Sequence, residues 1–365
     1  MPIPPAPTFQ ENQMALRPRA LAAAAAAAAL LLSLFGSPAA ASTASAAPSG
    51  GQARANCEPF TSQVAATEGA PADQRIVGTL CTPRSTRATT VQLLVHGGTY
   101  DKDYWTVRGR TGGPSYVEAA ARAGHAALAF DRLGTGASSA PHSSRFTDST
   151  HELVTLQLIR ALRDRGYRKV VLVGHSFGAT VARMVAAKHP DAVDGLILTG
   201  EGAPPNLAAF EEMFHLYVPA GQHPLLAGRG LDDGYLALRT GNKAAWFYNR
   251  RTTEPHVLLH DELTTEPGVY PTDPAYGDVA LNQRIRVPVL VVVGQGDKLI
   301  CGGTGTDCSS PATLKAAAAP LYGPRARLET LLVPDTGHSL NVHRTAPTWY
   351  AYVQDWTKRR VDGGR

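Results

Sequence analysis

Ser176 lies in a sequence pattern that is typical of an activated serine nucleophile. It is flanked by Gly174 and Gly178, with a β-branched run before the first glycine and small, helix-compatible residues after the second. We therefore expect a strand, a sharp turn at Ser176 and then a helix. Such a turn is strained and brings the chain close to itself, so its neighbours must lack bulk, as glycine does. The hydroxyl of Ser176 is then expected to project into a cleft.

The segments on both sides of Ser176 alternate between strand and helix patterns. Between residues 149 and 165, apolar side chains recur every three residues, which marks one face of a helix. Alternation of this kind predicts an α/β fold: a mostly parallel central sheet with helices on both faces. The predicted strands are an antiparallel hairpin at 61–66 and 75–81, followed by 90–95, 126–131, 170–173, 195–199, 288–293 and 327–333. The predicted helices are 115–123, 149–165, the segment after Ser176 to about 188, 311–319 and 346–359.

Residues 201–286 interrupt this alternation, which predicts a helical cap inserted between two core segments, 57–200 and 287–365. An insertion between two strands of an open sheet lies over their carboxyl ends, where ligands bind. We therefore expect cap aromatics to cover an apolar pocket, although packing within the cap is the alternative for any one of them. Four of the cap residues fall at the three- and four-residue steps of one helix face: Leu207, Phe210, Phe214 and Tyr217.

Residues 1–41 have the features of a secretory signal peptide. Arg17 and Arg19 precede an alanine- and leucine-rich run, and small residues of the A-x-A kind follow it. Residues 42–56, rich in Ala, Ser, Gly and Pro, are predicted to form a disordered linker. An uncleaved anchor is the alternative, but the apolar run is shorter than the roughly 20 residues of a stable membrane span. The protein is expected to be secreted, or retained at the cell envelope.

Export makes the four cysteines interpretable, because disulfides persist in oxidising compartments. Of the three pairings that four cysteines allow, we favour Cys57 with Cys81 and Cys301 with Cys308. The residues between the second pair are glycine-rich and can close so small a ring. Free thiols are the alternative. No histidine lies at ligand spacing from either pair, so we expect no zinc site and no other metal.

Composition narrows the classes of partner. Hydrophobic residues make up 44% of the 365 residues and charged residues 18%, which is typical of a globular chain and not of a disordered one. The net charge of +5 is a mild excess. No run of Lys and Arg alternates with aromatic residues, so nucleic-acid binding is not expected.

Four motifs, in chain order, resemble the α/β-hydrolase superfamily in its capped form. They are HGG at 96–98, the turn at Ser176, GQGD at 294–297 after a predicted strand, and DTGHS at 335–339 after the last predicted strand. The superfamily's chain order is nucleophile, acid, histidine, and this sequence has the same order. The loop that begins with Asp131 and Arg132 also resembles the family's loop after its fourth strand, where we expect these two residues to have structural roles.

The resemblance implies a role for each residue of the site. A serine hydroxyl needs a base within hydrogen-bond reach, and His338 is the family-equivalent base. Asp297 would hold the tautomer of His338 and stabilise the imidazolium that forms. The backbone N–H groups of Phe177 and Gly98 would bind the developing oxyanion, with Thr99 as a competing second donor.

Several alternatives stay open from sequence. Glu201 is the rival acid, because it follows the strand after the Ser176 helix, and Asp335 and Asp307 are weaker rivals. His343 is the nearest substitute base, and His175 is expected to orient the turn. We expect the Cys301–Cys308 disulfide to stiffen the loop of the acid. Substrate contacts are expected from His96, Tyr100, Phe210, Phe214 and Trp246.

The sequence therefore predicts an exported serine hydrolase that cleaves carboxylic esters through an acyl-enzyme on Ser176, with no cofactor. Its partner is expected to be a small-molecule ester or amide. Peptidase, acyltransferase and perhydrolase activities on the same residues are the alternatives, and a binding module without turnover is a less favoured one. A serine at the turn argues against haloalkane dehalogenases and epoxide hydrolases, whose mechanism needs a carboxylate nucleophile there. Oligomeric state and acyl preference are not encoded in any pattern that we recognise.

Overall fold

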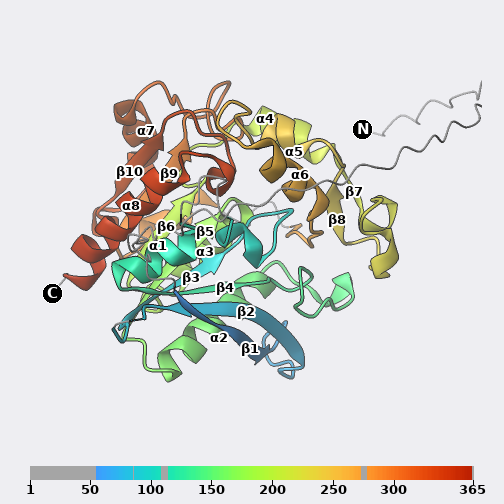
Figure 1. Ribbon diagram of the computed structural model, residues 1–365, viewed down its shortest axis with the longest axis horizontal. Coiled ribbons are helices and arrows are strands. Elements are labelled where there is room, and N and C mark those ends of the chain that lie inside the picture. Colours follow the sequence, from blue (N-terminus) through green and yellow to red (C-terminus); the bar gives the residue numbers. More distant parts are fainter. Residues whose placement is uncertain (1–54, 85, 108–113, 273–277, 364–365) are drawn as a thin grey trace, which may run out of the picture. The chain divides into compact units, whose positions relative to one another are not determined.

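The computed structural model describes residues 55–84, 86–107, 114–272 and 278–363 (Figure 1). The predicted signal peptide, and the predicted linker up to residue 54, lie outside these residues. Within the described ranges, none of the helices is both long and apolar enough to cross a membrane.

The core of the described chain is an eight-stranded sheet with the strand order β1-β2-β4-β3-β5-β6-β9-β10. The β1–β2 and β2–β4 pairs are antiparallel, and every other neighbouring pair is parallel. This confirms the predicted α/β architecture. The strands are β1 (Asn56–Val64), β2 (Gln74–Thr82), β3 (Thr90–Val95), β4 (Ala126–Phe130), β5 (Lys169–His175), β6 (Gly195–Thr199), β9 (Val289–Gly294) and β10 (Glu329–Val333).

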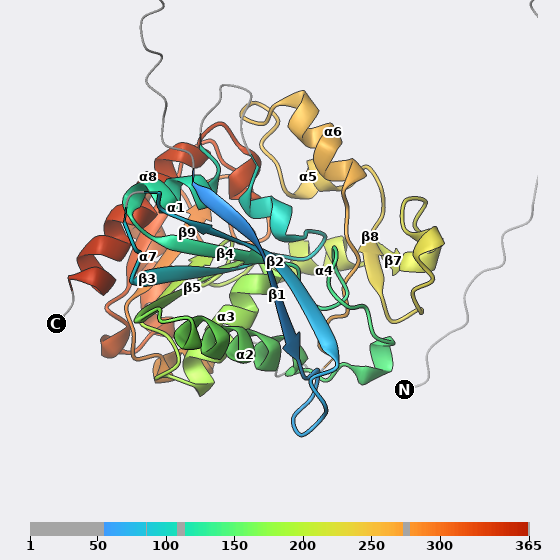
Figure 2. The same ribbon diagram turned by 60° about the horizontal axis from the view of Figure 1, so that its bottom comes forward.

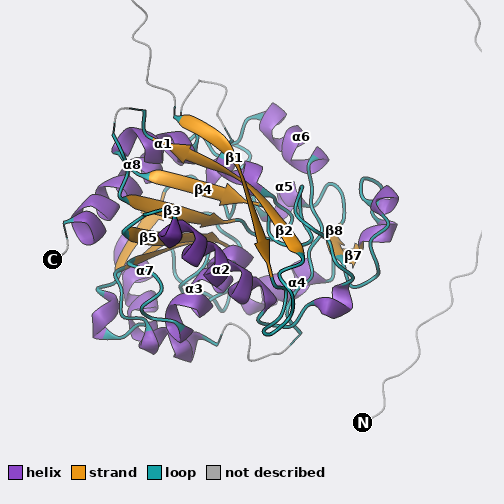
Figure 3. Cartoon of the chain, turned by 90° about the horizontal axis from the view of Figure 1, so that it is seen from below, coloured by secondary structure: helices purple, strands orange, loops and turns teal. Residues whose placement is uncertain are grey.

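Helices cover both faces of this sheet, because its parallel strands are buried on both sides. Successive residues of β3 alternate between two hydrophobic clusters: Val91, Leu93 and Val95 pack with α2, α3 and α7, whereas Leu94 packs with α1 and α8. Figures 2 and 3 show these two groups of helices on opposite sides of the strands. The helices are α1 (Tyr116–Ala123), α2 (Thr150–Asp164), α3 (Phe177–Lys188), α7 (Pro311–Ala318) and α8 (Ala346–Thr357).

The entry hairpin begins earlier than predicted, since β1 starts at Asn56 and not at Thr61. Cys57 and Cys81 face each other across the β1–β2 register and form a disulfide. This bond ties the outermost strand of the sheet to its neighbour at the point where the described chain begins.

The segment between β6 and β9 is not purely helical, which corrects the prediction of a helical cap. It contains α4 (Leu207–Phe214), α5 (Lys243–Trp246) and α6 (Pro255–Leu263), and also a two-stranded antiparallel sheet of β7 (Tyr217–Pro219) and β8 (Leu236–Leu238). Tyr217 therefore starts a strand and does not continue the predicted helical stripe. Figures 1 and 2 show these elements gathered at one end of the central sheet. We refer to residues 201–286 as the cap.

Candidate active site

The turn at Ser176 connects β5 to α3 and has a strained backbone. Ser176 has φ 51° and ψ −122°, a conformation that L-residues rarely adopt and that costs about 1–3 kcal/mol. Both flanking glycines are required by close approach. A Cβ on Gly174 would lie 2.4 Å from the Cα of Ala179, and one on Gly178 would lie 2.3 Å from the carbonyl oxygen of Val95. The turn places Ser176 in the wall of a cavity of about 160 Å³.

His338 lines the same cavity and is held by Asp297. The Nδ1–H of His338 donates to Oδ2 of Asp297 at 2.9 Å, and Oδ1 of Asp297 accepts the backbone N–H of Leu299 at 3.0 Å. Because a carboxylate can only accept, this bond leaves the lone pair of the imidazole on Nε2. Nε2 is buried and has no hydrogen-bond partner among the described residues. Of the four carboxylates considered from sequence, Asp297 is thus the one that the fold brings to His338.

No hydrogen bond joins Ser176 to His338 in the described structure. Bonds of this kind are often long in a free enzyme and tighten only when substrate binds. The two side chains nevertheless face one cavity, with an unengaged acceptor on His338.

The loop after β3 and the start of α3 place the two residues expected to bind the oxyanion, Gly98 and Phe177, at the same cavity. Gly98 and Phe177 line the cavity, whereas Thr99 does not. Among the described residues, neither the N–H of Gly98 nor that of Phe177 donates a hydrogen bond. Arg132 holds the loop after β3 in place. Its Nε donates to the carbonyl of His96 at 3.2 Å, and its Nη2 donates to the carbonyl of Gly97 at 3.1 Å.

His96 does not contact the cavity, contrary to the prediction that it binds substrate. Its Nδ1–H donates to the carbonyl of Gly97 at 2.9 Å, and its Nε2 accepts the backbone N–H of Arg132 at 3.1 Å. Burial, followed by the charge of Arg132, holds the pKa of His96 well below its usual value. His96 is therefore a neutral, structural part of the oxyanion loop.

His175 lines the cavity but is fixed within the fold. Its Nδ1 lies 3.1 Å from the hydroxyl of Thr199, and its ring stacks on Tyr104 with centroids 4.5 Å apart. Burial lowers the pKa of His175 well below its usual value, and the nearby His338 lowers it further. These contacts fix the orientation of a neutral His175 ring beside the turn at Ser176.

The rival acids and the rival base are engaged elsewhere. Glu201 lines the cavity, but its Oε1 accepts from Nε of Arg183 at 2.8 Å. Asp307 and Asp335 are exposed. His343 is buried with both ring nitrogens in use: Nε2 accepts the backbone N–H groups of Asn249 and Gly337, at 2.9 and 3.0 Å, and Nδ1–H donates to the carbonyl of Ser339 at 2.9 Å.

The cap forms the apolar wall of the cavity. Phe210 and Phe214 of α4 line it, as predicted from their spacing, whereas Leu207 of the same stripe is 68% exposed. Trp246 does not line the cavity, which corrects a second predicted substrate contact, and its neighbour Phe247 takes that place. Trp246 instead packs against a hydrophobic cluster that includes Met213, Leu238 and Val257 of the cap. Further cavity residues, none of them among the individual substrate contacts predicted from sequence, are Thr180, Gly200, Met213, Tyr217, Phe247, Tyr270 and Leu299.

Tyr100 lines the cavity with its hydroxyl already engaged. That hydroxyl lies 2.6 Å from the Oγ of Ser339 and donates to Oδ2 of Asp261 at 3.3 Å. Behind the ring, Nζ of the buried Lys243 lies 4.9 Å from the ring centroid and donates to the carbonyl of Asp261 at 2.6 Å. Burial raises the pKa of Asp261 to about 6. No sequence pattern predicted this buried pair of cap residues, Lys243 and Asp261.

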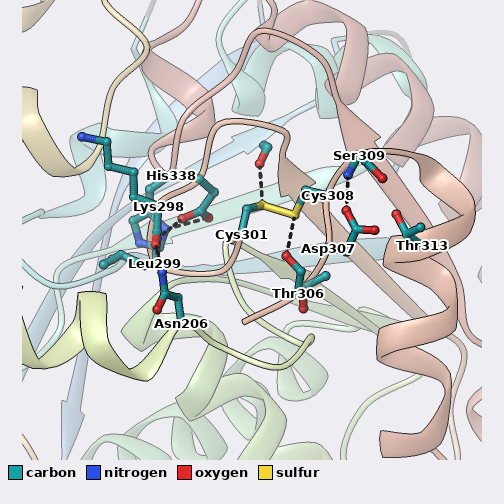
Figure 4. The surroundings of a disulfide bond; sticks show 12 residues. Asn206, Lys298, Leu299, Cys301, Thr306, Asp307, Cys308, Ser309, Thr313 and His338 are labelled. Atoms are coloured by element: carbon teal, nitrogen blue, oxygen red, sulfur yellow. Dashed lines mark hydrogen bonds and ion pairs between the residues drawn. A yellow bond between two sulfur atoms is a disulfide. The ribbon is translucent and has the colours of Figure 1, made fainter. Parts of the chain in front are cut away.

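A disulfide closes the loop that follows Asp297. Figure 4 shows the Cys301–Cys308 bond together with Leu299, Asn206 and His338. The backbone N–H of Cys301 donates to the carbonyl of Asp297 at 2.7 Å, and the N–H of Asn206, which caps α4, donates to the carbonyl of Leu299 at 2.8 Å. The loop therefore holds both the acid and the start of the helix that lines the cavity.

Comparison with known proteins identifies the family of the chain. A family model described as "Alpha/beta hydrolase family" matches residues 92–351, which is well over half of the chain. The chain belongs to the alpha/beta hydrolase family. Within the described part of this alpha/beta hydrolase, no group of three or more His, Cys, Asp or Glu side chains is arranged to hold a metal ion.

Individual relatives of this alpha/beta hydrolase match over shorter stretches. "Epoxide hydrolase 3" of Xenopus tropicalis is 35% identical over 106 residues, 29% of this chain and 26% of that protein. "Probable lysophospholipase BODYGUARD 1" of Arabidopsis thaliana is 32% identical over 124 residues, 34% of this chain and 24% of that protein. The chain thus aligns with about a quarter of the length of these relatives. A thermophilic esterase from Thermogutta terrifontis has the same fold, with a TM-score of 0.55 and 19% identity over 83% of this chain and 99% of that one.

Proposed function

We propose that this alpha/beta hydrolase is an exported serine hydrolase that cleaves carboxylic esters through an acyl-enzyme on Ser176. The observation that carries the proposal is that Ser176 and His338 line one cavity, while Asp297 accepts from Nδ1 of His338 and Nε2 has no hydrogen-bond partner among the described residues. The fold similarity to an esterase and the local similarity to a lysophospholipase are in keeping with ester chemistry.

In the first half-reaction, the Oγ of Ser176 attacks the ester carbonyl carbon while Nε2 of His338 takes its proton. The negative charge that develops on the carbonyl oxygen is bound by the N–H groups of Gly98 and Phe177, which are free to donate. Asp297, which is fully buried, stabilises the imidazolium. His338 then returns the proton to the departing alkoxide, and the acyl group stays on Ser176.

In the second half-reaction, water replaces the alcohol and the roles repeat. Nε2 of His338 takes a proton from water, the resulting hydroxide attacks the acyl carbon, and Ser176 leaves with the proton that His338 returns. Both halves use the same oxyanion donors, so one fixed geometry serves two steps.

The apolar wall of the cavity indicates which kind of substrate group it holds. An apolar cavity of about 150 Å³ accommodates benzene, and the cavity at Ser176 measures about 160 Å³ with Phe210, Met213, Phe214 and Leu299 in its wall. We therefore infer that it binds an apolar acyl or alcohol group of roughly aromatic-ring size.

Export is supported by the N-terminal sequence and by two disulfides, Cys57–Cys81 and Cys301–Cys308. Such bonds persist in oxidising compartments. Expression of the full chain should yield a shortened, secreted protein without free thiols. Mass spectrometry of the secreted and cell-bound fractions would detect this, and a full-length reduced protein inside the cell would contradict it.

A fluorophosphonate probe tests the nucleophile directly. We expect it to label the wild-type protein and not Ser176→Ala, with the label on the peptide that contains residue 176. Nitrophenyl esters of increasing chain length, assayed beside aminoacyl anilides, then separate esterase from peptidase activity. Turnover should peak at short acyl chains and be absent with the anilides. A wild-type protein that neither reacts with the probe nor turns over any ester would refute the proposal.

A further inference from the structure

Tyr270 comes from the cap but lies at the oxyanion loop. A Cβ on Gly98 would be 2.8 Å from the hydroxyl oxygen of Tyr270, so this hydroxyl lies directly against the backbone of Gly98. The Tyr270 ring packs edge-on against the ring of Phe177, with centroids 5.2 Å apart. Tyr270 thus touches both residues whose backbone N–H groups are proposed to bind the oxyanion, and it lines the same cavity.

The hydroxyl of Tyr270 is buried and makes no well-formed hydrogen bond among the described residues, although the hydroxyl of Tyr217 and the backbone of Thr99 lie close enough to interact with it. Three other buried tyrosines bond within the protein: Tyr100 bonds Ser339, Tyr235 donates to the carbonyl of Pro141 at 2.6 Å, and Tyr322 donates to the carbonyl of Gly202 at 3.0 Å. The hydroxyl of Tyr248 is also buried without a partner among the described residues, but Tyr248 does not line the cavity. Burial raises the pKa of Tyr270, so its hydroxyl keeps its proton at neutral pH. A buried donor without a well-formed hydrogen bond is costly and calls for an explanation.

The backbone around Tyr270 is firmly held. The N–H of Glu266 donates to the carbonyl of Thr99 at 3.0 Å, and Gly268 exchanges two backbone hydrogen bonds of 2.9 Å with Leu236 of β8. A Cβ on Gly268 would lie 2.9 Å from the Tyr270 ring, so only glycine lets the ring fold back at this point. The hydroxyl is therefore positioned in advance, as a group that stabilises a transition state must be.

We propose that the hydroxyl of Tyr270 is a third hydrogen-bond donor to the substrate's carbonyl oxygen, beside the N–H groups of Gly98 and Phe177. The inference rests on the proposed function. The bond strengthens as the carbonyl oxygen becomes negative, and the phenol donates without giving up its proton, so the proton transfers of His338 are unchanged. The oxyanion site then includes a cap residue and is complete only when the cap is seated on the core.

The test is Tyr270→Phe, which removes the hydroxyl and keeps the ring against Phe177. With nitrophenyl esters we expect kcat to fall on the order of a hundredfold to a thousandfold with little change in KM, as for the loss of one oxyanion donor. Affinity for a trifluoromethyl ketone, whose adduct with Ser176 carries an oxyanion, should fall by a similar factor. The melting temperature should change little, because this hydroxyl makes no well-formed hydrogen bond among the described residues.

Tyr235→Phe is the matched control, because Tyr235 is a buried cap tyrosine that does not line the cavity. Its hydroxyl bonds Pro141, so this variant should melt at a lower temperature and keep its kcat. A Tyr270→Phe variant with unchanged kcat and unchanged ketone affinity would overturn the role of Tyr270, whether or not its melting temperature falls. Absence of any Ser176-dependent hydrolysis in the wild type would instead overturn the proposed function, and this inference with it.

Discussion

Replacing Asp297 with asparagine tests the central geometry of the site, because the two side chains have the same shape. In the native site Oδ2 accepts the Nδ1–H of His338 at 2.9 Å, and Oδ1 accepts the N–H of Leu299 at 3.0 Å. Asparagine can satisfy Leu299 with its carbonyl oxygen only by turning its NH₂ group toward Nδ1. That NH₂ donates to Nδ1 and forces the imidazole proton onto Nε2, where it blocks proton transfer from Ser176.

The size of the effect follows from this tautomer change. The same substitution in a serine-protease triad costs about ten-thousandfold in kcat, which is about 5.4 kcal/mol at roughly 1.36 kcal/mol per tenfold. Asp297 is fully buried, so solvent cannot relieve the wrong tautomer. We therefore expect Asp297→Asn to lower kcat on the order of a thousandfold to ten-thousandfold. The melting temperature should change little, because the volume is conserved and the contact with Leu299 is kept.

Initial rates with a nitrophenyl ester measure this effect, with thermal melts confirming the fold of each variant. Asp307→Asn is the matched control, since Asp307 is an exposed carboxylate in the same region and should keep wild-type turnover. Glu201→Gln distinguishes the rival acid. A loss of less than tenfold in Asp297→Asn, together with a thousandfold loss in Glu201→Gln, would refute the assignment of Asp297.

Three further outcomes are expected. Ser176→Ala and His338→Ala should each lower kcat on the order of a thousandfold or more, and the double variant should lose little beyond either, because the two residues act as one unit; near-normal turnover in either single variant would contradict their roles. Replacing both Cys301 and Cys308 with serine should lower the free energy of unfolding by about 2–3 kcal/mol, because the unfolded chain gains the entropy of the opened loop. It should also lower kcat, because the loop that holds Asp297 loosens. Unchanged melting and turnover would contradict the proposal that this disulfide stiffens the loop. Burial lowers the pKa of His343 to about 4 from about 6.5. The stability that the neutral ring contributes is therefore full above pH 6.5 and is lost as the pH falls toward 4, on the order of 3 kcal/mol. The melting temperature should fall more steeply with decreasing pH in the wild type than in His343→Gln, and equal slopes would contradict this.

The order of strands and helices could be predicted from sequence, because each depends on residues close together in the chain. β3 and β6 match their predicted ranges, and α1, α2 and α7 match theirs to within a residue at each end. The turn at Ser176 was predictable for the same reason, since Gly174 and Gly178 meet atoms of the same turn and of the neighbouring strand. Tyr217 was misplaced because helical spacing at the end of α4 does not exclude a strand that begins there.

Tertiary structure decided which side chains meet. Asp297, Glu201, Asp307 and Asp335 were all candidate acids from sequence. Only packing shows that Arg183 bonds Glu201 and that His338 bonds Asp297. Packing likewise turns His96 toward Arg132, away from the cavity.

Features set by neighbouring residues could be predicted from sequence, whereas contacts between the cap and the core could not. The sequence alone determined the strained turn at Ser176, since this turn depends on a few adjacent residues with small side chains. The position of Tyr270 against Gly98, and of Phe247 in place of Trp246, depends on how the cap folds onto the core. Such contacts join residues far apart in the chain, and no local spacing encodes them, because their energy comes from burial that exists only once the chain has folded.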